Sequence, residues 1–431
     1  MLTARRRVVA TAAAVLTGSL LLASCGGSDG GSSDGRTLTL WHYEGPDSAM
    51  GVAWNEAIKE FEAQHPGVKV KFEEKGFEQI QKTAPMVLNS SDAPDIMEYN
   101  KGNATAGLLS KQGLLTDLTA EATARGWDKK LDAGVRTTSQ YDANGVMGSG
   151  KWYGVPDYAE YTMVFYNKDL FAKYGLPAPT TFDRLTSAMA AFAAKGVTPL
   201  ANAGAEYVAQ QYLYQLALSR ADRSWVDSYE LYKGRTDFHD AAWTYAATTF
   251  ADWVKKGYIS EKSSSLKAED AGVSFIRGKS PILFSGSWWY GRFKAENKFD
   301  WGTALWPGSN LTPGSGGNLW VVPKGARNKE LAYDFIDITL SKKIQNLLGN
   351  KGGVPVAADP SAITDPQAKS LIANFNTLSR RDGLAFYPDW PVAGFYDVLV
   401  SETQKLITGS ESTDDFLDAL QKAYDQGVPK T

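Results

Sequence analysis

The chain has 431 residues, of which 43% are hydrophobic and 22% charged, and its formal net charge is −3. This length is too great for one ordinary hydrophobic core and predicts two domains. The composition is typical of a soluble globular protein, and the slightly acidic balance gives no reason to expect a nucleic-acid partner.

The N-terminal segment has the features of a secretory signal. Arg5-Arg6-Arg7 precede a mostly apolar run, Val8 to Leu22, which is too short to be read as a membrane-spanning helix. The next residues, Leu22-Ala23-Ser24-Cys25, resemble the lipobox of bacterial lipoproteins, in which cleavage leaves Cys25 as the lipid-modified first residue. Because Cys25 is the sole cysteine, we predict a lipoprotein signal peptide over residues 1–24. The alternative is a plain signal peptide with an incidental cysteine.

Residues 25–36 are expected to form the lipidated cysteine and a flexible tether, because they are mainly Gly, Ser and Asp. Removal of residues 1–24 takes away three arginines and no acid, so the formal charge changes from −3 to −6. The expected location is the extracellular face of the cell membrane, without internal disulfides. His42, His65 and His239 share no ligand-like spacing, so neither a metal nor another cofactor is expected.

The first part of the folded chain alternates between strands and helices. Strands are predicted near residues 37–41, 68–72 and 93–97, separated by helices whose apolar residues fall at helical spacing around 50–61 and 77–88. This alternation predicts an α/β fold with parallel strands and helices on both faces of the sheet.

The stretch from Lys151 to Phe171 is predicted to cross between two lobes. Gly154 and Pro156 interrupt the backbone before an apolar strand at 161–166, and a turn into a helix follows. Residues 180–256 are then dominated by helical patterns. Strands return near 278–284 and 318–323, and the last helices are expected at 329–340, 395–407 and 416–424.

Three segments carry a resemblance to a known family: VFYNKDLF at 164–171, GKSPILFSGSWW at 278–289 and GGNLWVVPKGARNKELAYDFI at 316–336. In this order, and with the lipobox, they resemble the extracellular solute-binding proteins of bacterial sugar importers, the maltose-binding-protein-like family. The resemblance implies a two-lobed, periplasmic-binding-protein-like α/β fold with a ligand cleft at the hinge. It also implies a saccharide ligand, ABC transporter permease subunits as partners, a membrane lipid anchor and a monomeric chain.

The same resemblance predicts how the chain is divided. Lobe one is expected to contain residues 37–155 and 279–325, and lobe two residues 156–278 and 326–431.

A sugar has apolar faces and a rim of hydroxyl groups, so its site needs aromatic platforms together with carboxylates and amides. The chain has 13 Trp and 20 Tyr, and several lie at the ends of predicted elements, where open parallel sheets bind ligands. The predicted ligand-binding residues are Glu44, Trp288, Glu160, Asp157, Asn318, Trp320, Trp390, Tyr387, Trp289, Asn100, Tyr43 and Glu206.

Some of these assignments come from the resemblance and some have structural alternatives. Relatives carry a sugar-stacking tryptophan at the position of Trp288 and a ligand-contacting acid at that of Glu160. Adjacent aromatic residues on a helix point about 100° apart, so one of Trp288 and Trp289 could face the cleft while the other packs. Glu160 and Asp157 could instead form a hinge salt bridge, and Trp320 could belong to the core.

Catalytic readings find little support. The sequence has no G-x-S-x-G elbow and no Walker-type loop, and its three scattered histidines do not suggest a triad. The principal alternative is a glycoside hydrolase that would use two carboxylates from among Glu44, Asp157 and Glu160. A binding protein for a non-sugar solute is the other. We expect no catalysis, and capture of a di- or oligosaccharide.

Overall fold

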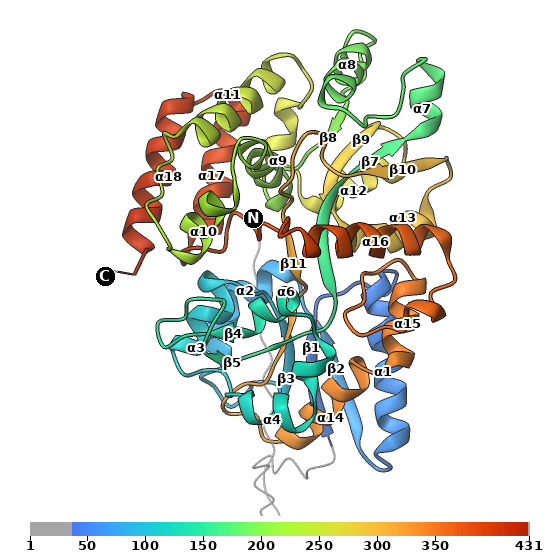
Figure 1. Ribbon diagram of the computed structural model, residues 1–431, viewed down its shortest axis with the longest axis vertical. Helices are drawn as coiled ribbons and strands as arrows, with labels where there is room; N and C mark the ends of the chain where they lie inside the picture. Colours follow the sequence, from blue (N-terminus) through green and yellow to red (C-terminus); the bar gives the residue numbers. More distant parts are fainter. Residues whose placement is uncertain (1–36, 430–431) are drawn as a thin grey trace, which may run out of the picture. The chain divides into compact units, whose positions relative to one another are not determined.

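The computed structural model describes residues 37–429, which belong to one compact unit built around two sheets (Figure 1). The predicted signal peptide, the lipidation site Cys25 and the tether lie outside the described residues. Among residues 37–429, no helix combines the length and the apolar character that a membrane crossing would need.

The first sheet has the strand order β2-β1-β3-β12-β6. β1 is parallel to both β2 and β3, whereas β12 is antiparallel to β3 and β6. Its strands are β1 (Thr37–His42), β2 (Lys69–Glu74), β3 (Ile96–Tyr99), β6 (Val155–Pro156) and β12 (Leu319–Val321). The parallel part agrees with the strand–helix alternation of the first hundred residues.

Helix α1 (Ala49–Gln64) shows how the sequence builds this lobe. The Ser48 hydroxyl accepts a hydrogen bond from Gly51 N at 2.9 Å, which satisfies one free N–H of the first turn. Trp54, Ala57 and Phe61 then form a buried stripe. Helices α14 (Lys329–Thr339) and α15 (Lys342–Asn350) pack on α1.

The second sheet is organised around β7 (Ala159–Asn167), which is buried along nearly its whole length. β7 pairs antiparallel with each of three other strands, and β8 pairs parallel with β9. The further strands of this sheet are β8 (Leu200–Ala201), β9 (Ile282–Gly286), β10 (Trp301–Ala304) and β11 (Gly314–Gly316). This lobe is therefore mixed, not purely parallel.

Helix α9 (Tyr207–Leu218) is buried from Val208 to Leu218 and packs against α11 (Ala241–Lys255) and α17 (Phe395–Thr408). The other α-helices are α2 (Phe77–Val87), α3 (Leu108–Lys111), α4 (Thr119–Ala124), α5 (Trp127–Lys130), α6 (Ala133–Arg136), α7 (Lys168–Lys173), α8 (Phe182–Ala193), α10 (Arg223–Leu231), α12 (Ala268–Ile276), α13 (Tyr290–Glu296), α16 (Pro366–Arg380) and α18 (Thr413–Gly427). The remaining short elements are a π-helix (Asn103–Gly107), 3₁₀ turns at Thr137–Ser139, Glu261–Ser265, Ser287–Trp289 and Pro360–Ala362, and the paired strands β4 (Gln140–Tyr141) and β5 (Lys151–Trp152).

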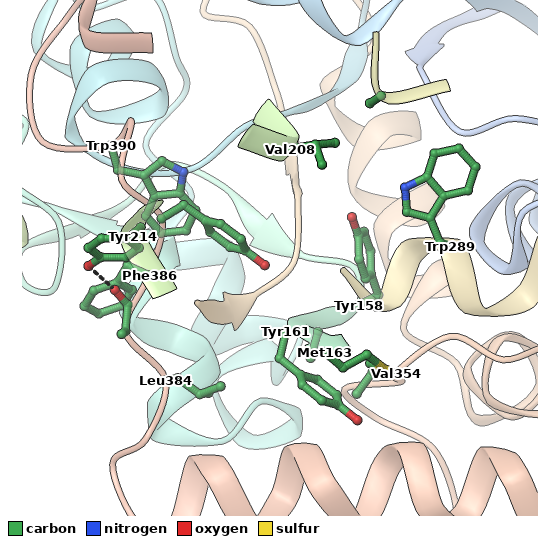
Figure 2. Packing of buried hydrophobic residues seen from close by; sticks show 14 of the residues in the cluster. Tyr158, Tyr161, Met163, Val208, Tyr214, Trp289, Val354, Leu384, Phe386 and Trp390 are labelled. Atoms are coloured by element: carbon green, nitrogen blue, oxygen red, sulfur yellow. Dashed lines mark hydrogen bonds between the residues drawn. The ribbon is translucent and has the colours of Figure 1, made fainter. Parts of the chain in front are cut away.

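Three chain segments connect the lobes and lie side by side. The first joins β6 to β7, the second joins β11 to β12, and the third follows α15. Asp157 N donates to Asn318 O at 3.1 Å, Gly317 N to Tyr158 O at 2.6 Å, and Ala159 N to Val354 O at 2.7 Å. Tyr161, Met163 and Val354 cluster next to these crossings (Figure 2). The predicted two-lobed α/β fold and the crossing at β6–β7 are thus confirmed.

The predicted division of the chain differs from the observed pairing in two places. Residues 279–325 were expected in lobe one, but β9, β10 and β11 pair with β7 in the second sheet. Residues 326–431 were expected in lobe two, but α14 and α15 pack on α1 of the first lobe. The physical reason is that long-range antiparallel pairing decides which lobe a strand joins, and side-chain periodicity carries no information on the partner.

Candidate functional site

A cavity of about 210 Å³ lies between the lobes, next to the β6–β7 and β11–β12 crossings. Residues of the first lobe that line it are Tyr43, Glu44, Phe77, Asn100, Lys101 and Asn318. From the second lobe and the β6–β7 crossing come Tyr158, Glu160, Tyr207, Gln211, Trp288, Tyr387, Asp389, Trp390 and Tyr396. Both lobes therefore contribute to one site at the hinge.

Aromatic rings form a connected wall of this cavity. Trp288 follows β9 and is half-buried, and its indole N–H donates to the Tyr207 hydroxyl at 3.2 Å. Its ring centroid lies 5.7 Å from that of Tyr207 and 6.2 Å from that of Tyr387, which in turn lies 5.3 Å from Trp390. Figure 2 shows Trp390 beside Phe386. Such fixed rings offer flat apolar platforms.

Two glycines hold these tryptophans in place by their lack of a side chain. A Cβ atom on Gly102 would lie 2.6 Å from Cγ of Trp390, and one on Gly286 would overlap the indole of Trp288. Gly102 also has φ +104°, which disfavours other residues. Each ring is therefore seated directly against main chain.

Four buried polar side chains at the hinge satisfy one another, and we call them the paired cluster: Lys101, Tyr158, Glu160 and Asn318. The Lys101 ammonium donates to Glu160 Oε1 at 2.5 Å and to Asn318 Oδ1 at 3.0 Å. The Tyr158 hydroxyl donates to Glu160 Oε2 at 2.9 Å, and Asn318 Nδ2 donates to the Tyr158 oxygen at 2.8 Å. These residues come from the end of β3, from β7 and from two crossings, so the bonds tie the hinge segments together.

A second group of buried polar side chains has no comparable partners, and we call it the carboxyl cluster: Glu44, Glu98 and Asp157. Glu98 and Asp157 are fully buried, and neither carboxyl group has a donor in hydrogen-bonding geometry among residues 37–429. Among the described residues, the one side-chain hydrogen bond that Glu44 accepts is a long one from Ser48, at 3.4 Å. Burial raises the pKa of all three carboxyl groups well above the usual value, and mutual repulsion raises it further. Burial therefore favours the protonated form of each of these carboxyl groups.

Other polar groups line the cavity. Gln211, on the buried helix α9, has its side-chain oxygen without a partner among the described residues, and the same holds for the hydroxyl groups of Tyr43 and Tyr387. Asp389 lies between Tyr387 and Trp390 in sequence, and burial raises the pKa of its carboxyl group to about 6. These groups can exchange hydrogen bonds with a ligand.

The structure brings most of the predicted ligand-binding residues to the cavity. These are Tyr43, Glu44, Asn100, Glu160, Trp288, Asn318, Tyr387 and Trp390. Their contact with a ligand stays a prediction.

The other predicted residues do not line the cavity. Trp320 is fully buried on β12 with its ring 5.5 Å from Trp54, so it belongs to the core. Trp289 stacks on Phe293 at 5.4 Å, which makes it the packing member of the tryptophan pair.

The two remaining acids, Glu206 and Asp157, also lie outside the cavity lining. Glu206 accepts a hydrogen bond from Ala268 N at 2.8 Å and so satisfies the start of α12. Asp157 lies outside the cavity lining, against Glu98 in the carboxyl cluster.

Several lining residues were not among the predicted set: Phe77, Lys101, Tyr158, Tyr207, Gln211, Asp389 and Tyr396. Most are close in sequence to predicted residues, as Lys101 is to Asn100. Phe77 and Tyr396 begin or nearly begin helices far apart in the chain, and nothing in their local pattern distinguishes them from packing residues.

The comparison with protein families matches this chain to the bacterial extracellular solute-binding proteins over residues 45–346. The match covers more than half of the sequence, so the chain belongs to the family of bacterial extracellular solute-binding proteins.

Among curated proteins, the chain is 25% identical over 351 residues to the multiple sugar-binding protein of Streptococcus mutans, covering 79% of this chain and 80% of that protein. It is 28% identical over 342 residues to the maltodextrin-binding protein MdxE of Bacillus subtilis, with 75% of each chain covered. The diacetylchitobiose binding protein DasA of Streptomyces coelicolor is 26% identical over 355 residues, with 77% of this chain and 78% of that protein covered.

Solved structures share the fold. A chitin oligosaccharide binding protein superposes with a TM-score of 0.78 at 24% identity, covering 91% of this chain and 98% of the other. The GacH receptor of Streptomyces glaucescens gives a TM-score of 0.73 at 22% identity, covering 90% and 97%.

Proposed function

We propose that this protein is the extracellular substrate-binding component of an ABC sugar importer, which captures a di- or oligosaccharide and delivers it to the permease. The observation that carries the proposal is a hinge cavity with aromatic walls and with polar groups that have no partner in the described part of the chain. The family and the sugar-binding relatives support it.

The cavity chemistry suits a sugar better than most small solutes. The apolar C–H faces of a pyranose stack on rings such as Trp288, while hydroxyl groups exchange hydrogen bonds with Glu44, Asn100 and Gln211. Platforms from separate elements, including Phe77 on α2 and Trp390 after α16, support a ligand of more than one ring.

The proposed mechanism is capture by closure. A ligand touching both lobes stabilises the closed form by its differential affinity for the two states, and the hinge crossings permit the motion. No covalent bond is made or broken. Closure then presents a joint surface of the two lobes to the permease.

The proposal includes attachment to the membrane through Cys25, with the monomeric binding protein on the extracellular face. A diacylated cysteine holds a protein more firmly than a single chain. Cys25→Ser should release the protein from washed membranes, whereas Ser24→Ala, next to it, should leave it attached. Wash-resistant attachment of the Cys25→Ser variant would contradict the anchor.

The test of function is a thermal-shift screen of the purified protein against mono-, di- and oligosaccharides. A ligand at a hundredfold excess over its Kd should add about 2.7 kcal/mol to the unfolding free energy. The sugar should be recovered intact, because a glycoside hydrolase would return fragments. Absence of any shift would point to a non-sugar solute.

Trp288→Ala should abolish most of the shift while the variant remains folded. Trp289→Phe is the matched control, since Trp289 packs beside the cavity wall without lining it. An unchanged sugar affinity in Trp288→Ala would remove this ring from the site.

A further inference from the structure

The positively charged side chain that lines the cavity already forms an ion pair with a carboxylate. Lys101 is the one Lys or Arg among the described residues that line the cavity. Its ammonium lies 2.5 Å from Glu160 and 3.0 Å from Asn318, within the paired cluster. The positive charge of Lys101 is therefore balanced by Glu160, and a second carboxylate in the cavity has no cation of its own among the lining residues.

Asp389 is that second carboxylate. It is partly buried in the cavity wall. Within residues 37–429, its own backbone and, more weakly, Lys101 favour its charged form. Burial raises its pKa to about 6, so at neutral pH the group is mainly ionised and lacks a close counter-charge.

The walls around Asp389 accept positive charge. The Lys101 ammonium lies 5.6 Å from the ring centroid of Tyr387 and 5.4 Å from that of Trp390, the two aromatic residues that flank Asp389 in this loop. Aromatic faces attract cations electrostatically.

We propose that the ligand is an amino sugar, a saccharide with a basic nitrogen, whose protonated amine pairs with Asp389 against the rings of Tyr387 and Trp390. This inference rests on the proposed function and specifies its substrate class. An ammonium group forms a charge-assisted hydrogen bond and a Coulombic pair with Asp389, whereas a hydroxyl at the same place supplies only the hydrogen bond.

The test is calorimetric titration of the purified protein with matched sugar pairs that differ only in one substituent. Glucosamine is compared with glucose, and the β-1,4 disaccharide of glucosamine with cellobiose and with its N-acetylated form. The amino member of a pair should bind at least about tenfold more tightly, as expected for a partly buried charge pair.

The variant that isolates the charge is Asp389→Asn, which keeps the shape of the side chain. The ratio of amino-sugar to neutral-sugar affinity should fall towards one. Asp382→Asn is the matched control, because Asp382 lies in the preceding turn with 77% of its side chain exposed, and it should keep the wild-type ratio.

The outcomes separate the two proposals. Equal or tighter binding of the neutral sugars overturns the amino-sugar inference and leaves the sugar-binding function standing. Binding of spermidine in place of every sugar overturns both and indicates a polyamine receptor. An amino-sugar preference that persists in Asp389→Asn overturns the role of Asp389.

Discussion

The paired cluster and the carboxyl cluster are both buried and interact electrostatically. They differ in how a buried carboxyl group is stabilised. In the paired cluster, Glu160 has an ammonium on one oxygen and a phenol on the other. In the carboxyl cluster, Glu98 and Asp157 have no donor in hydrogen-bonding geometry among the described residues. A buried charge is tolerated where it is paired, and where it is not paired burial favours the protonated form.

The comparison distinguishes the residues that hold the hinge segments together from the residues that are available to bind a ligand. Both carboxylate oxygens of Glu160 and both polar atoms of the Asn318 side chain form hydrogen bonds within the paired cluster. These two residues therefore fix the positions of the crossing segments relative to each other. Within residues 37–429, the Glu44 carboxyl group accepts a single long hydrogen bond, from Ser48, and Glu44 lines the cavity. The side chains with spare hydrogen-bonding capacity are therefore mostly outside the paired cluster.

The largest expected effect comes from removing the cation. Lys101→Met keeps the length of the side chain but leaves Glu160 buried without its counter-charge, which should cost about 3–5 kcal/mol of unfolding free energy. Urea denaturation measures this loss. Lys111→Met, at an exposed site on α3, should change stability by less than about 0.5 kcal/mol. A similarly small loss for Lys101→Met would show that the two clusters do not differ as described.

A smaller loss is expected from the neutral member of the paired cluster. Tyr158→Phe removes one hydroxyl and leaves Glu160 Oε2 and Asn318 Nδ2 without partners, which should cost about 1–3 kcal/mol. Tyr153→Phe is the control, since Tyr153 lies five residues earlier, outside the cluster and outside the cavity lining. Equal effects of the two variants would mean that the hydroxyl of Tyr158 adds no stability.

The carboxyl cluster should respond in the opposite direction. The unfolded Asp157 ionises near pH 3.9, but its folded pKa is raised well above the usual value by burial. Its contribution to stability is therefore complete below about pH 3.9 and declines as pH rises, by up to about 1.4 kcal/mol per pH unit. Because an amide does not titrate, Asp157→Asn should flatten the decline of the unfolding free energy above about pH 4 and so stabilise the protein at higher pH.

Denaturation curves at several pH values measure this slope. Asp382→Asn, at an exposed aspartate, should keep the wild-type slope. An unchanged slope in Asp157→Asn would indicate that Asp157 is ionised in the folded protein.

The sequence predicted the elements of the fold better than their pairing. The strand expected at 37–41 is β1 (Thr37–His42), because its β-branched and apolar residues precede an amphipathic helix. The lobe of β9 and β10 was predicted wrongly. Both are held by antiparallel pairing to β7, more than a hundred residues earlier in the chain, and no local property of a strand specifies such a partner.

The candidate site was predictable where residues follow the ends of strands. Trp288 after β9, Asn100 after β3 and Glu44 after β1 all line the cavity. Trp320 and Asn318 are two residues apart, so the alternation of side chains along a strand predicts the same face for both. In the structure β12 begins at Leu319, and Asn318 lies in the crossing before it. Lys101 gave no signal, since a lone lysine is most often an exposed residue.

Substitution of Gly102 or Gly286 would change the dimensions of the cavity indirectly, through the tryptophan that each contacts. Each lies directly against the ring of a tryptophan that lines the cavity, without lining the cavity itself. A side chain added at either position would push the ring into the cavity or displace it from the wall. During divergence, receptors of this kind can thus acquire a new ligand preference through glycines that never contact it, with every ligand-contacting residue unaltered.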